Sequence, residues 1–420
     1  MSTDVETTAS ARRSTTRVGW VILALALGGF GIGTTEFVAM GLLPNIAADL
    51  GITEPVAGHL ISAYALGVVV GAPVIAVLAA RVSRRALLIG LMVAFTVGNA
   101  LSIAAQSYGT LMAARFVAGL PHGAYFGVAA LVAAHLAGPG KRASAVGKVM
   151  MGLSVANVAG VPAATWLGQA LGWRSALALV VVIGVLTVAS LWRVLPDLQS
   201  MPTSSPEAEL GGLRRGQIWL TLLVGTVGFG GFFAFYTYLN TALTSLGGLS
   251  ESAVPIALML FGAGMVTGNY VGGRMADSLG DRAIGIGMAA AAATLLLFAL
   301  LVSTGWPAVI VTFFVGCSGS TAIPGLQTRL MDVAHDAQTI AAALNHSALN
   351  VANALGAWLG GIVIAQGLGY RAPSIAGAGL AVGGVVVLVI AVLAARRSGV
   401  APAEREEAVA VGTDRYSELS

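Results

Sequence analysis

Charged and thiol side chains are both scarce in this sequence. Only 10% of its 420 residues are Asp, Glu, Lys or Arg, whereas a soluble domain carries about 25%. The single cysteine, Cys317, has no partner for an intrachain disulfide. The sequence also lacks a phosphate-binding loop, a cluster of metal ligands and a nucleophile triad. We therefore expect neither ATP hydrolysis nor a bound metal or cofactor.

Apolar residues dominate the chain instead. They make up 57% of it, with a mean hydropathy of +0.87. About 20 apolar residues cross the hydrocarbon core of a bilayer as a helix, and runs of this length recur between short polar breaks. We expect an all-α membrane protein with twelve transmembrane helices, at about 20–43, 56–80, 86–105, 109–136, 145–170, 174–195, 217–243, 253–276, 283–303, 307–330, 338–366 and 372–395.

The basic residues indicate the orientation of these helices. Of 22 Lys and Arg, only Arg115 lies deep inside a span, and only Arg174 and Arg371 fall in odd-numbered loops. Because positive charge concentrates in cytoplasmic loops, both termini are expected in the cytoplasm. The scattered positions argue against nucleic-acid binding. Arg far outnumbers Lys, and Ala, Gly and Val are abundant, which is typical of a bacterium with a GC-rich genome, so we expect a multi-pass protein of the bacterial cytoplasmic (inner) membrane.

The two halves of the sequence match at an offset of about 197 positions. LGWR (171–174) corresponds to LGYR (368–371), and VANVAG (155–160) to VANALG (351–356). Duplicated sets of six spans are typical of transporters. We expect two pseudo-symmetric six-helix bundles, with a cytoplasmic N-tail at 1–17, bundles at 18–195 and 217–397, a polar cytoplasmic linker at 196–216 and a cytoplasmic C-tail at 398–420.

The loop after the second span resembles a short-loop motif of the major facilitator superfamily, Gly-x-x-x-Asp-Arg-x-Gly-Arg-Arg. In AARVSRR (79–85), Arg81, Arg84 and Arg85 fit the motif, but Ala80 stands where the family has Asp and Ser83 where it has Gly. In the family this acid takes part in a latch that closes the cytoplasmic side. The first half of this chain therefore lacks the acid of that latch.

The loop after the eighth span resembles a second copy of the same motif. In GRMADSLGDR (273–282), Gly273, Asp277 and Gly280 fit, while Ser278 and Asp281 stand where Arg is usual. The resemblance implies that these residues, with the arginines of the first copy, control the conformation of the cytoplasmic side.

Other stretches narrow the resemblance to one branch. RFVAGLPHGAYFG (115–127) is similar to the span-four motif of drug:proton antiporters, and GTTEFVAMGLLPNIAADLGI (33–52) and ALGAWLGG (354–361) resemble arabinose-efflux and chloramphenicol-resistance permeases. NVAGVPAATWLG (157–168) is similar to an antiporter motif ending in Gly-Pro, except that Val161 separates Gly160 from Pro162. The resemblance covers about residues 18–395 and implies proton-driven export by two rocking bundles.

Four charged or histidine side chains lie deep inside the spans, away from their ends: Glu36, Arg115, His122 and His346. Inserting a charged side chain costs at least about 2.5–3.5 kcal/mol, so such groups usually face a cavity or a partner. At about 1.5 Å per helical residue, Glu36 and Arg115 reach the same depth. We expect them to form a switchable pair that couples proton entry to transport. A permanent salt bridge, or Glu36 bonded to a neighbouring threonine, is the alternative.

Polar residues on two further helix faces are candidates for proton or substrate contacts. His122 shares a face with Arg115, and it is expected either to relay protons or to act as a neutral hydrogen-bond donor. His346, Asn350 and Asn353 share a face in span eleven, and Asn157 corresponds to Asn353 after the duplication. Substrate contact and interhelical hydrogen bonding both remain open for these residues.

Aromatic side chains complete the candidate substrate site. Span seven contains FGGFFAFYTY (229–238), with Phe232 and Tyr236, and Tyr64 and Tyr125 lie in spans two and four. Aromatic walls with few polar groups suit amphipathic organic molecules, although aromatic residues in a span also face lipid or pack between helices.

These observations predict a proton-coupled exporter, an antiporter, of small amphipathic organic compounds such as a chloramphenicol-like antibiotic. Its expected partners are the small-molecule substrate, protons and the lipid bilayer, and we expect a monomer that is not an enzyme. A sugar or metabolite exporter of the same fold, with a more polar cavity, is the nearest alternative. A membrane-embedded enzyme, for which His335 and Asp336 are the one candidate pair, and a sensor that has lost transport are more distant alternatives.

Overall fold

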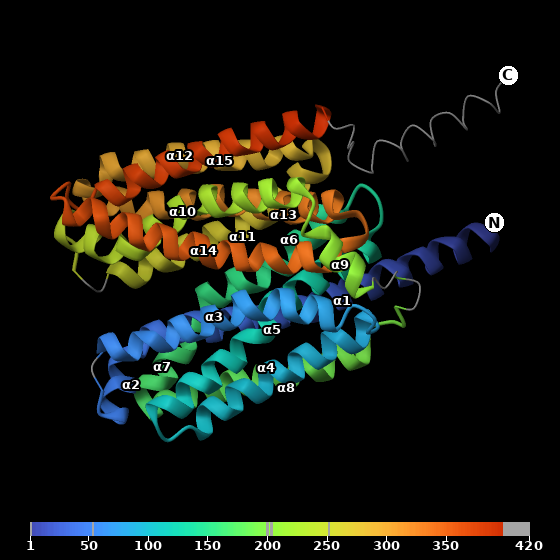
Figure 1. Cartoon of the computed structure of the whole chain (residues 1–420), viewed down its shortest axis with the longest axis horizontal. Coiled ribbons are helices and arrows are strands. Elements are labelled where there is room, and N and C mark those ends of the chain that lie inside the picture. Colours follow the sequence, from blue (N-terminus) through green and yellow to red (C-terminus); the bar gives the residue numbers. More distant parts are fainter. Residues whose placement is uncertain (1, 53, 199–200, 202–204, 251–252, 398–420) are drawn as a thin grey trace.

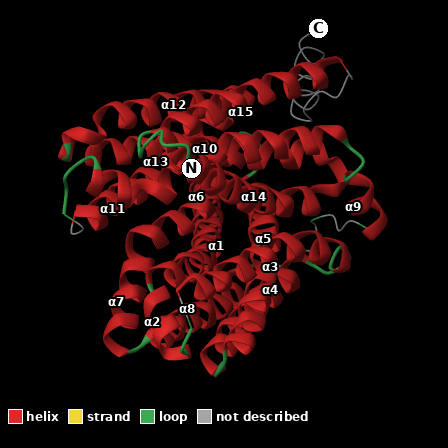
Figure 2. Cartoon of the chain, turned by 60° about the vertical axis from the view of Figure 1, so that its left-hand side comes forward, coloured by secondary structure: helices red, strands yellow, loops and turns green. Residues whose placement is uncertain are grey.

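The chain folds into helices joined by turns, and no strand occurs among the described residues (Figure 2). The computed structural model describes residues 2–52, 54–198, 201, 205–250 and 253–397. In hydrocarbon a backbone must satisfy its own hydrogen bonds, and a helix does so within one segment. Across the described ranges, 11 segments are long and apolar enough to span a membrane, and one of them, 306–365, contains two helices. The expected twelve-helix, all-α membrane protein is confirmed.

The first half contains six spans and one short helix. The fifth span is interrupted by a π-helical turn, η1, and the short helix α2 follows the first span. The elements are α1 (Ser2–Gly41), α2 (Leu43–Leu50), α3 (Glu54–Leu78), α4 (Arg84–Ala104), α5 (Tyr108–Ala137), α6 (Arg142–Val155), η1 (Ala156–Gly160), α7 (Val161–Leu171) and α8 (Trp173–Val194). The first helix thus begins inside the stretch expected as the N-tail.

The second half repeats the arrangement after a short linker helix, α9. Its elements are α9 (Pro206–Gly212), α10 (Gly216–Ser245), α11 (Val254–Leu279), α12 (Asp281–Leu301), η3 (Val302–Thr304), α13 (Trp306–Ala334), η4 (His335–Ala337), α14 (Gln338–Ala365) and α15 (Ala372–Arg397). Both η3 and η4 are single 3₁₀ turns. The expected C-tail, 398–420, lies outside the described residues.

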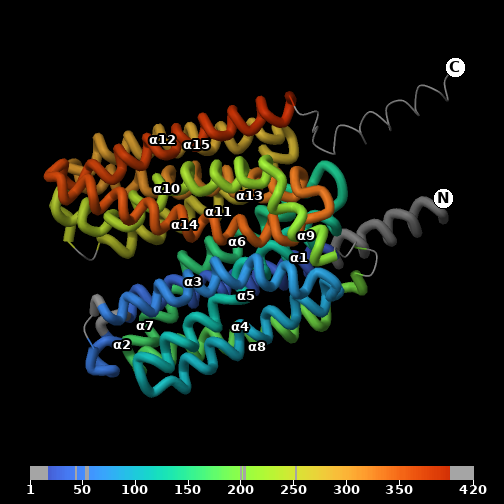
Figure 3. The backbone as a smooth tube through the Cα atoms, viewed as in Figure 1, coloured from blue at the N-terminus to red at the C-terminus, as the bar shows by residue number. Residues whose placement is uncertain are grey.

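The spans form two groups that lie side by side, one for each half of the sequence (Figures 1 and 3). Helix α9 lies at one end of the molecule, where it packs against α3 of the first half and α14 of the second. We call this end the linker end. Helices α3, α5 and α6 of the first half contact α11, α13 and α14 of the second, so these six helices form the boundary between the halves.

Equivalent glycines hold the closest helix pairs in each half. Gly67 of α3 faces the carbonyl oxygen of Phe116, and Gly264 of α11 faces that of Phe313. A Cβ atom at either glycine would overlap the facing oxygen, and small residues allow helices in a membrane to approach closely. Gly67 and Gly264 are 197 positions apart, as are the two phenylalanines. The duplication read from the sequence therefore extends to the packing.

The outer surface of the bundle suits a lipid environment. Large aliphatic side chains on α8 and α15 are exposed, and so are tryptophans near the ends of several helices. Tryptophan is enriched where a membrane meets water. The exposed tryptophans at the linker end are Trp20, Trp192 and Trp219, and those toward the opposite end are Trp166, Trp306 and Trp358.

Candidate functional site

A cavity of about 90 Å³ lies between the two halves. Drug-sized ligands occupy roughly 300–1,000 Å³, so a substrate of that size requires the halves to separate further. Six aromatic side chains line it, and most of them belong to α10: Phe37, Phe229, Phe232, Phe233, Tyr236 and Phe261. The polar lining consists of Glu36, His122, Ser154, Asn157, Asn269, His346, Asn350 and Asn353.

Most of the residues expected at the site come together at this cavity. Both histidines, all three candidate asparagines, Phe232, Tyr236 and Glu36 line it, although they come from five different helical segments. Arg115, Tyr64 and Tyr125 are not among the described residues that line it.

Arg115 is buried in the first half and is held by α1 and α3. Its Nη1 donates to Thr35 Oγ1 at 3.0 Å, and its Nη2 donates to the Thr35 carbonyl oxygen at 3.1 Å. The guanidinium carbon lies 4.5 Å from the centre of the Tyr64 ring, within the range of a cation–π contact. Thr35 in turn donates from its hydroxyl to Asn99 Oδ1 at 2.6 Å. A positive charge is thereby fixed beside the cavity.

Glu36 is half-buried and borders the cavity without an ion pair to Arg115 among the described residues. A permanent salt bridge, one of the two alternatives, is thus not formed in this conformation. The neighbouring threonine hydroxyls do not donate to it either, because Thr34 Oγ1 donates to the Phe30 carbonyl oxygen at 2.7 Å and Thr35 donates to Asn99. Glu36 therefore belongs to the polar lining of the cavity and forms neither of the two expected bonds.

The two histidines meet across the boundary between the halves. Tyr64 Oη lies 3.1 Å from His122 Nδ1, and the ring centres of His122 and His346 lie 5.4 Å apart. His346 stacks on Phe126 with ring centres 4.4 Å apart. His346 Nε2 is buried and has no hydrogen-bond partner among the described groups, and such an atom is costly to leave unpaired. It is therefore available to a ligand or to water in the cavity.

Tyr125 packs inside the first half, away from the cavity. Its hydroxyl donates to the Leu25 carbonyl oxygen at 2.9 Å, and its ring lies against Gly28 of α1. Because Gly28 has no side chain, α1 leaves room for the tyrosine. Of the two alternatives for Tyr125, packing between helices is the one that this conformation contains.

In two of the candidate asparagines, the amide NH₂ group donates a hydrogen bond to the backbone of its own helix. Asn157 Nδ2 donates to the Leu153 carbonyl oxygen at 3.1 Å, and Asn350 Nδ2 donates to the His346 carbonyl oxygen at 2.9 Å. These bonds fix the amides against their own helices, while both residues line the cavity. Their Oδ1 atoms can accept hydrogen bonds from a substrate.

The π-helical turn explains how the fifth span accommodates its extra residue. It ends at Gly160, and α7 begins with Val161 and Pro162. A π turn contains one more residue than an α turn, and the Val161 N–H bonds to the Ala156 carbonyl oxygen. The turn thereby accommodates the extra residue between the glycine and the proline. Gly160 packs against Phe30 and Thr34 of α1. The same turn contains Asn157, which it brings to the cavity.

The second copy of the loop motif joins the two halves at the linker end. Asp277 accepts hydrogen bonds from the backbone N–H of Ala143 at 2.8 Å and of Ser144 at 3.0 Å, in the first turn of α6. Gly273 allows this approach, because a Cβ there would contact Ala143 and Ser144. Gly280 follows α11 with a φ of 56°, a conformation that glycine adopts readily.

The arginines of the first copy have different surroundings. Arg81 is exposed, and Arg85 Nη2 donates to the Trp192 carbonyl oxygen at 2.7 Å. Arg84 is buried, and the negative charge of Glu209 in α9 acts on it.

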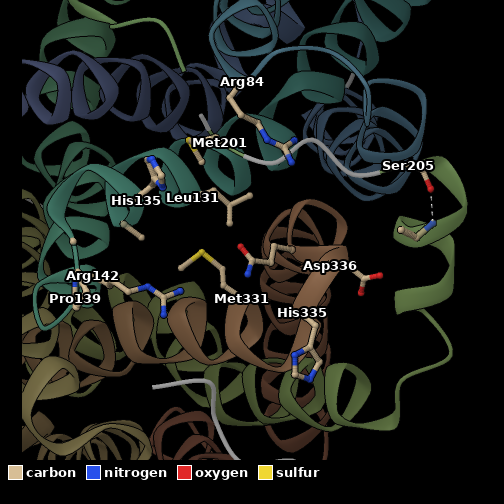
Figure 4. A pocket seen from close by; sticks show the side chains of 14 residues that line it. Arg84, Leu131, His135, Pro139, Arg142, Met201, Ser205, Met331, His335 and Asp336 are labelled. Carbon is tan, nitrogen blue, oxygen red and sulfur yellow. Dashed lines mark hydrogen bonds between the residues drawn. The ribbon is translucent and has the colours of Figure 1, made fainter. Parts of the chain in front are cut away.

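A second cavity, of about 610 Å³, lies at the linker end. Figure 4 shows Arg84 and His135 on one side of it, Met331 and Asp336 on the other, and Ser205 at the start of α9. We call this cavity the vestibule. Asp336 accepts a hydrogen bond from Arg215 at 2.5 Å, so the acid of the pair that an embedded enzyme would use forms an ion pair with Arg215.

Several polar residues of the site were missed in the sequence. Thr35 and Asn99 hold Arg115, and Ser154 accepts a hydrogen bond from Asn269 Nδ2 at 3.0 Å beside the cavity. These four residues are uncharged and lie outside span eleven, so the sequence criteria that we applied did not select them. A uniform search for amides within apolar runs would have found Asn99 and Asn269.

Comparison with known proteins agrees with the fold. The sequence model of the Major Facilitator Superfamily matches residues 25–345 and also 248–416. Inner membrane transport protein YdhP of Escherichia coli (strain K12) is 41% identical over 374 residues, which are 89% of this chain and 96% of that protein. A chloramphenicol resistance protein of Streptomyces lividans is 34% identical over 361 residues, 82% of this chain and 88% of that one.

A solved structure shares the same fold. The proton:xylose symporter XylE, bound to 6-bromo-6-deoxy-D-glucose, superposes with a TM-score of 0.72 over 89% of this chain and 95% of its own, at 14% identity. At this level of identity the likeness concerns the arrangement of the helices.

Proposed function

Because the chain belongs to the Major Facilitator Superfamily and is a multi-pass membrane transporter, we propose that it is a proton-coupled exporter of small amphipathic organic compounds. One observation carries this proposal: the Glu36 carboxyl group borders the central cavity, while Arg115 is bonded to Thr35. An acid that is not committed to an ion pair can gain and lose a proton as the cavity changes its access.

The proposed cycle uses competition between proton and substrate. When the cavity opens to the outside, a proton binds Glu36 and the substrate leaves. When the cavity opens to the cytoplasm, Glu36 releases that proton and substrate binds beside the carboxylate. The fixed guanidinium of Arg115 stabilises the ionised carboxylate, whereas a closed apolar cavity favours the neutral form. The two bundles rock around this midplane site.

The composition of the cavity supports an amphipathic substrate with an aromatic or apolar part. Aromatic rings from α1, α10 and α11 provide apolar contact area, and the amides and His346 provide a few directional polar groups. The name of the chloramphenicol resistance protein makes a chloramphenicol-like compound a natural first probe. No cofactor is invoked, since the proton gradient supplies the energy.

We further propose that the linker end faces the cytoplasm of a bacterial cell. Most of the basic loops lie at this end, as the positive-inside rule requires, and YdhP is named as an inner membrane protein. The site requires residues of one chain only, which fits a monomer.

The test is transport by purified protein in proteoliposomes with an imposed proton gradient. Wild-type protein should move chloramphenicol uphill against proton flow. Glu36→Gln should still bind the drug but lose uphill transport, because the amide cannot titrate. Uphill transport that persists in Glu36→Gln, or that returns in a double variant with Arg115→Gln, would contradict the coupling role. Transport of a neutral sugar in place of the drug would favour the sugar-exporter alternative.

A further inference from the structure

The linker helix α9 places one carboxyl group in the interior of the protein. Glu209 is fully buried, and its Oε2 accepts a hydrogen bond from the backbone N–H of Ile340 at 2.9 Å. Ile340 lies in the first turn of α14, whose N-cap residue, Ala337, provides no side-chain cap. A carboxylate at this position satisfies an N–H that has no partner within the helix and interacts favourably with the helix dipole.

An equivalent contact caps α6, the helix of the first half that corresponds to α14. There the carboxylate comes from α11 and not from the linker. Asp277 accepts from the N–H of Ala143 in the first turn of α6. Ala143 and Ile340 are 197 positions apart, so the two capped amides are equivalent under the duplication. The position equivalent to Asp277 in the first half is Ala80, which has no carboxyl group. Glu209 thus caps the amide that the missing acid would have reached.

Arg84, the buried arginine of the first motif copy, lines the vestibule beside the start of α9 (Figure 4). Helix α9 contacts α3 and α14, which belong to different halves. Ser205, the N-cap residue of α9, lines the vestibule (Figure 4). Ala208 of α9 and Gln338 at the start of α14 line it as well. The carboxyl group of Glu209 therefore lies at the linker end, on a helix that contacts both halves.

We propose that Glu209 replaces, from the linker, the helix-capping acid that the first half lacks at position 80, and that it holds α14 against α3 so that the linker end stays closed. Glu209 is a positioning residue for transport, since it acts through α14, the helix that carries His346, Asn350 and Asn353 to the cavity. The proposal needs the rocking motion of the two bundles but neither proton coupling nor a particular substrate.

The experiment measures how often the vestibule opens. Cys317→Ser removes the native thiol, and Ala134→Cys places a small thiol on the vestibule wall. Purified protein in detergent is then labelled with a bulky maleimide. Glu209→Gln should raise the labelling rate about tenfold, a shift of about 1.4 kcal/mol toward the open state. Asp277→Asn should act in the same direction, because it weakens the equivalent contact.

Glu207→Gln is the matched control. Glu207 lies on the same helix, is exposed, and loses the same charge on substitution, so its labelling rate should equal that of the parent. An unchanged rate in Glu209→Gln, or an equal acceleration in Glu207→Gln, would overturn the proposal. A lower melting temperature of Glu209→Gln with an unchanged labelling rate of the folded fraction would also overturn it, since Glu209 would then serve folding alone. None of these readouts requires transport, so they stand apart from the test of Glu36.

Discussion

Asn269 of α11 donates a hydrogen bond to Ser154 of α6 at 3.0 Å, and this bond joins the two halves at the wall of the central cavity. Both side chains are buried. Hydrogen bonds between membrane helices contribute about 0.6 kcal/mol on average and at most about 1.7. We expect Ser154→Ala to favour separation of α6 from α11, raising maleimide labelling of a vestibule cysteine at position 134 by about threefold.

Thr187→Ala provides the control for this substitution. Thr187 is also buried, but its hydroxyl donates to the Ile183 carbonyl oxygen within its own helix at 2.8 Å. Labelling should not change in this variant. If both variants label at the parent rate, the bond between Asn269 and Ser154 does not limit the separation of the halves.

Thr35 is expected to be essential for keeping Arg115 in the membrane. Thr35→Val preserves the shape of the side chain but removes the hydroxyl that accepts from Arg115 Nη1. Leaving a buried polar group without its partner costs about 1–3 kcal/mol, so the yield of folded protein and its melting temperature should fall. Thr35→Ser, which keeps the hydroxyl, should retain most of both. Equal stability of Thr35→Val and the wild type would show that the carbonyl and the Tyr64 ring hold Arg115 without it.

The fold could be predicted from the sequence because bilayer thickness fixes the length of each apolar run. The 197-residue offset predicted the duplication, and the structure shows that it extends to packing contacts such as those of Gly67 and Gly264. Four residues of the candidate site, Glu36, Arg115 and the two histidines, could be selected from the sequence because burying a charged group in a membrane is costly. The partner of Arg115 could not be inferred, since Thr35 is 80 positions away and threonines occur in many spans.

The linker shows a different limit of sequence analysis. Residues 196–216 are polar and were expected to form a cytoplasmic linker, with no sign in their composition that Glu209 would be buried, as it is. A short polar helix becomes buried only when two separately folded surfaces close around it, and local composition carries no sign of that docking. Ala80, which stands where the motif has an acid, was the one indication in the sequence. Without that acid the first turn of α14 needs a hydrogen-bond acceptor from another part of the chain.

Substituting the equivalent glycines of the closest helix pairs by alanine should lower the folded yield to a similar degree in both halves. Gly67→Ala and Gly264→Ala each place a methyl group against a facing carbonyl oxygen, and such overpacking costs about 1–3 kcal/mol. Both variants should lose folded yield to a similar degree. Gly90→Ala, where a Cβ meets open space, is the control and should fold as well as the wild type. A loss in one half alone would contradict the equivalence of the two contacts.

Protonation of Asp49 in α2 should cause a modest loss of folding stability at acid pH. Its Oδ2 accepts from Trp173 Nε1 at 3.0 Å and from Arg174 Nη1 at 2.6 Å, and these hydrogen bonds lower the pKa of Asp49. The stabilisation is complete above the unfolded-state pKa of about 3.9 and disappears as the pH falls through the lower folded-state value. Since the Asp49 side chain is 45% exposed, the effect should stay below about 1 kcal/mol.

Melting temperatures of the purified protein between pH 7 and pH 3 measure this contribution. Asp49→Asn should melt lower than the wild type at pH 7, and the difference should shrink as the acid side chain of the wild type becomes protonated. A difference that stays constant over this range would exclude Asp49 as its source.

The last prediction concerns substrate selection by the cavity face of α14. Asn350 donates to the His346 carbonyl oxygen, which leaves its Oδ1 to accept from a hydroxyl or amide N–H of the substrate. Asn350→Leu keeps the volume of the side chain but removes this acceptor, at a cost of about 0.5–1.5 kcal/mol, or about two- to thirteenfold in Kd. The KM for chloramphenicol, which carries such donors, should rise by that factor, while an amphipathic compound without donors should be transported as before. Asn345→Leu is the matched control on the same helix: Asn345 bonds to Gln327 and does not line the cavity, so its loss should reduce folded protein and affect all compounds alike. If Asn350→Leu instead weakens transport of every compound equally, together with folded yield, Asn350 packs the helices and does not select the substrate.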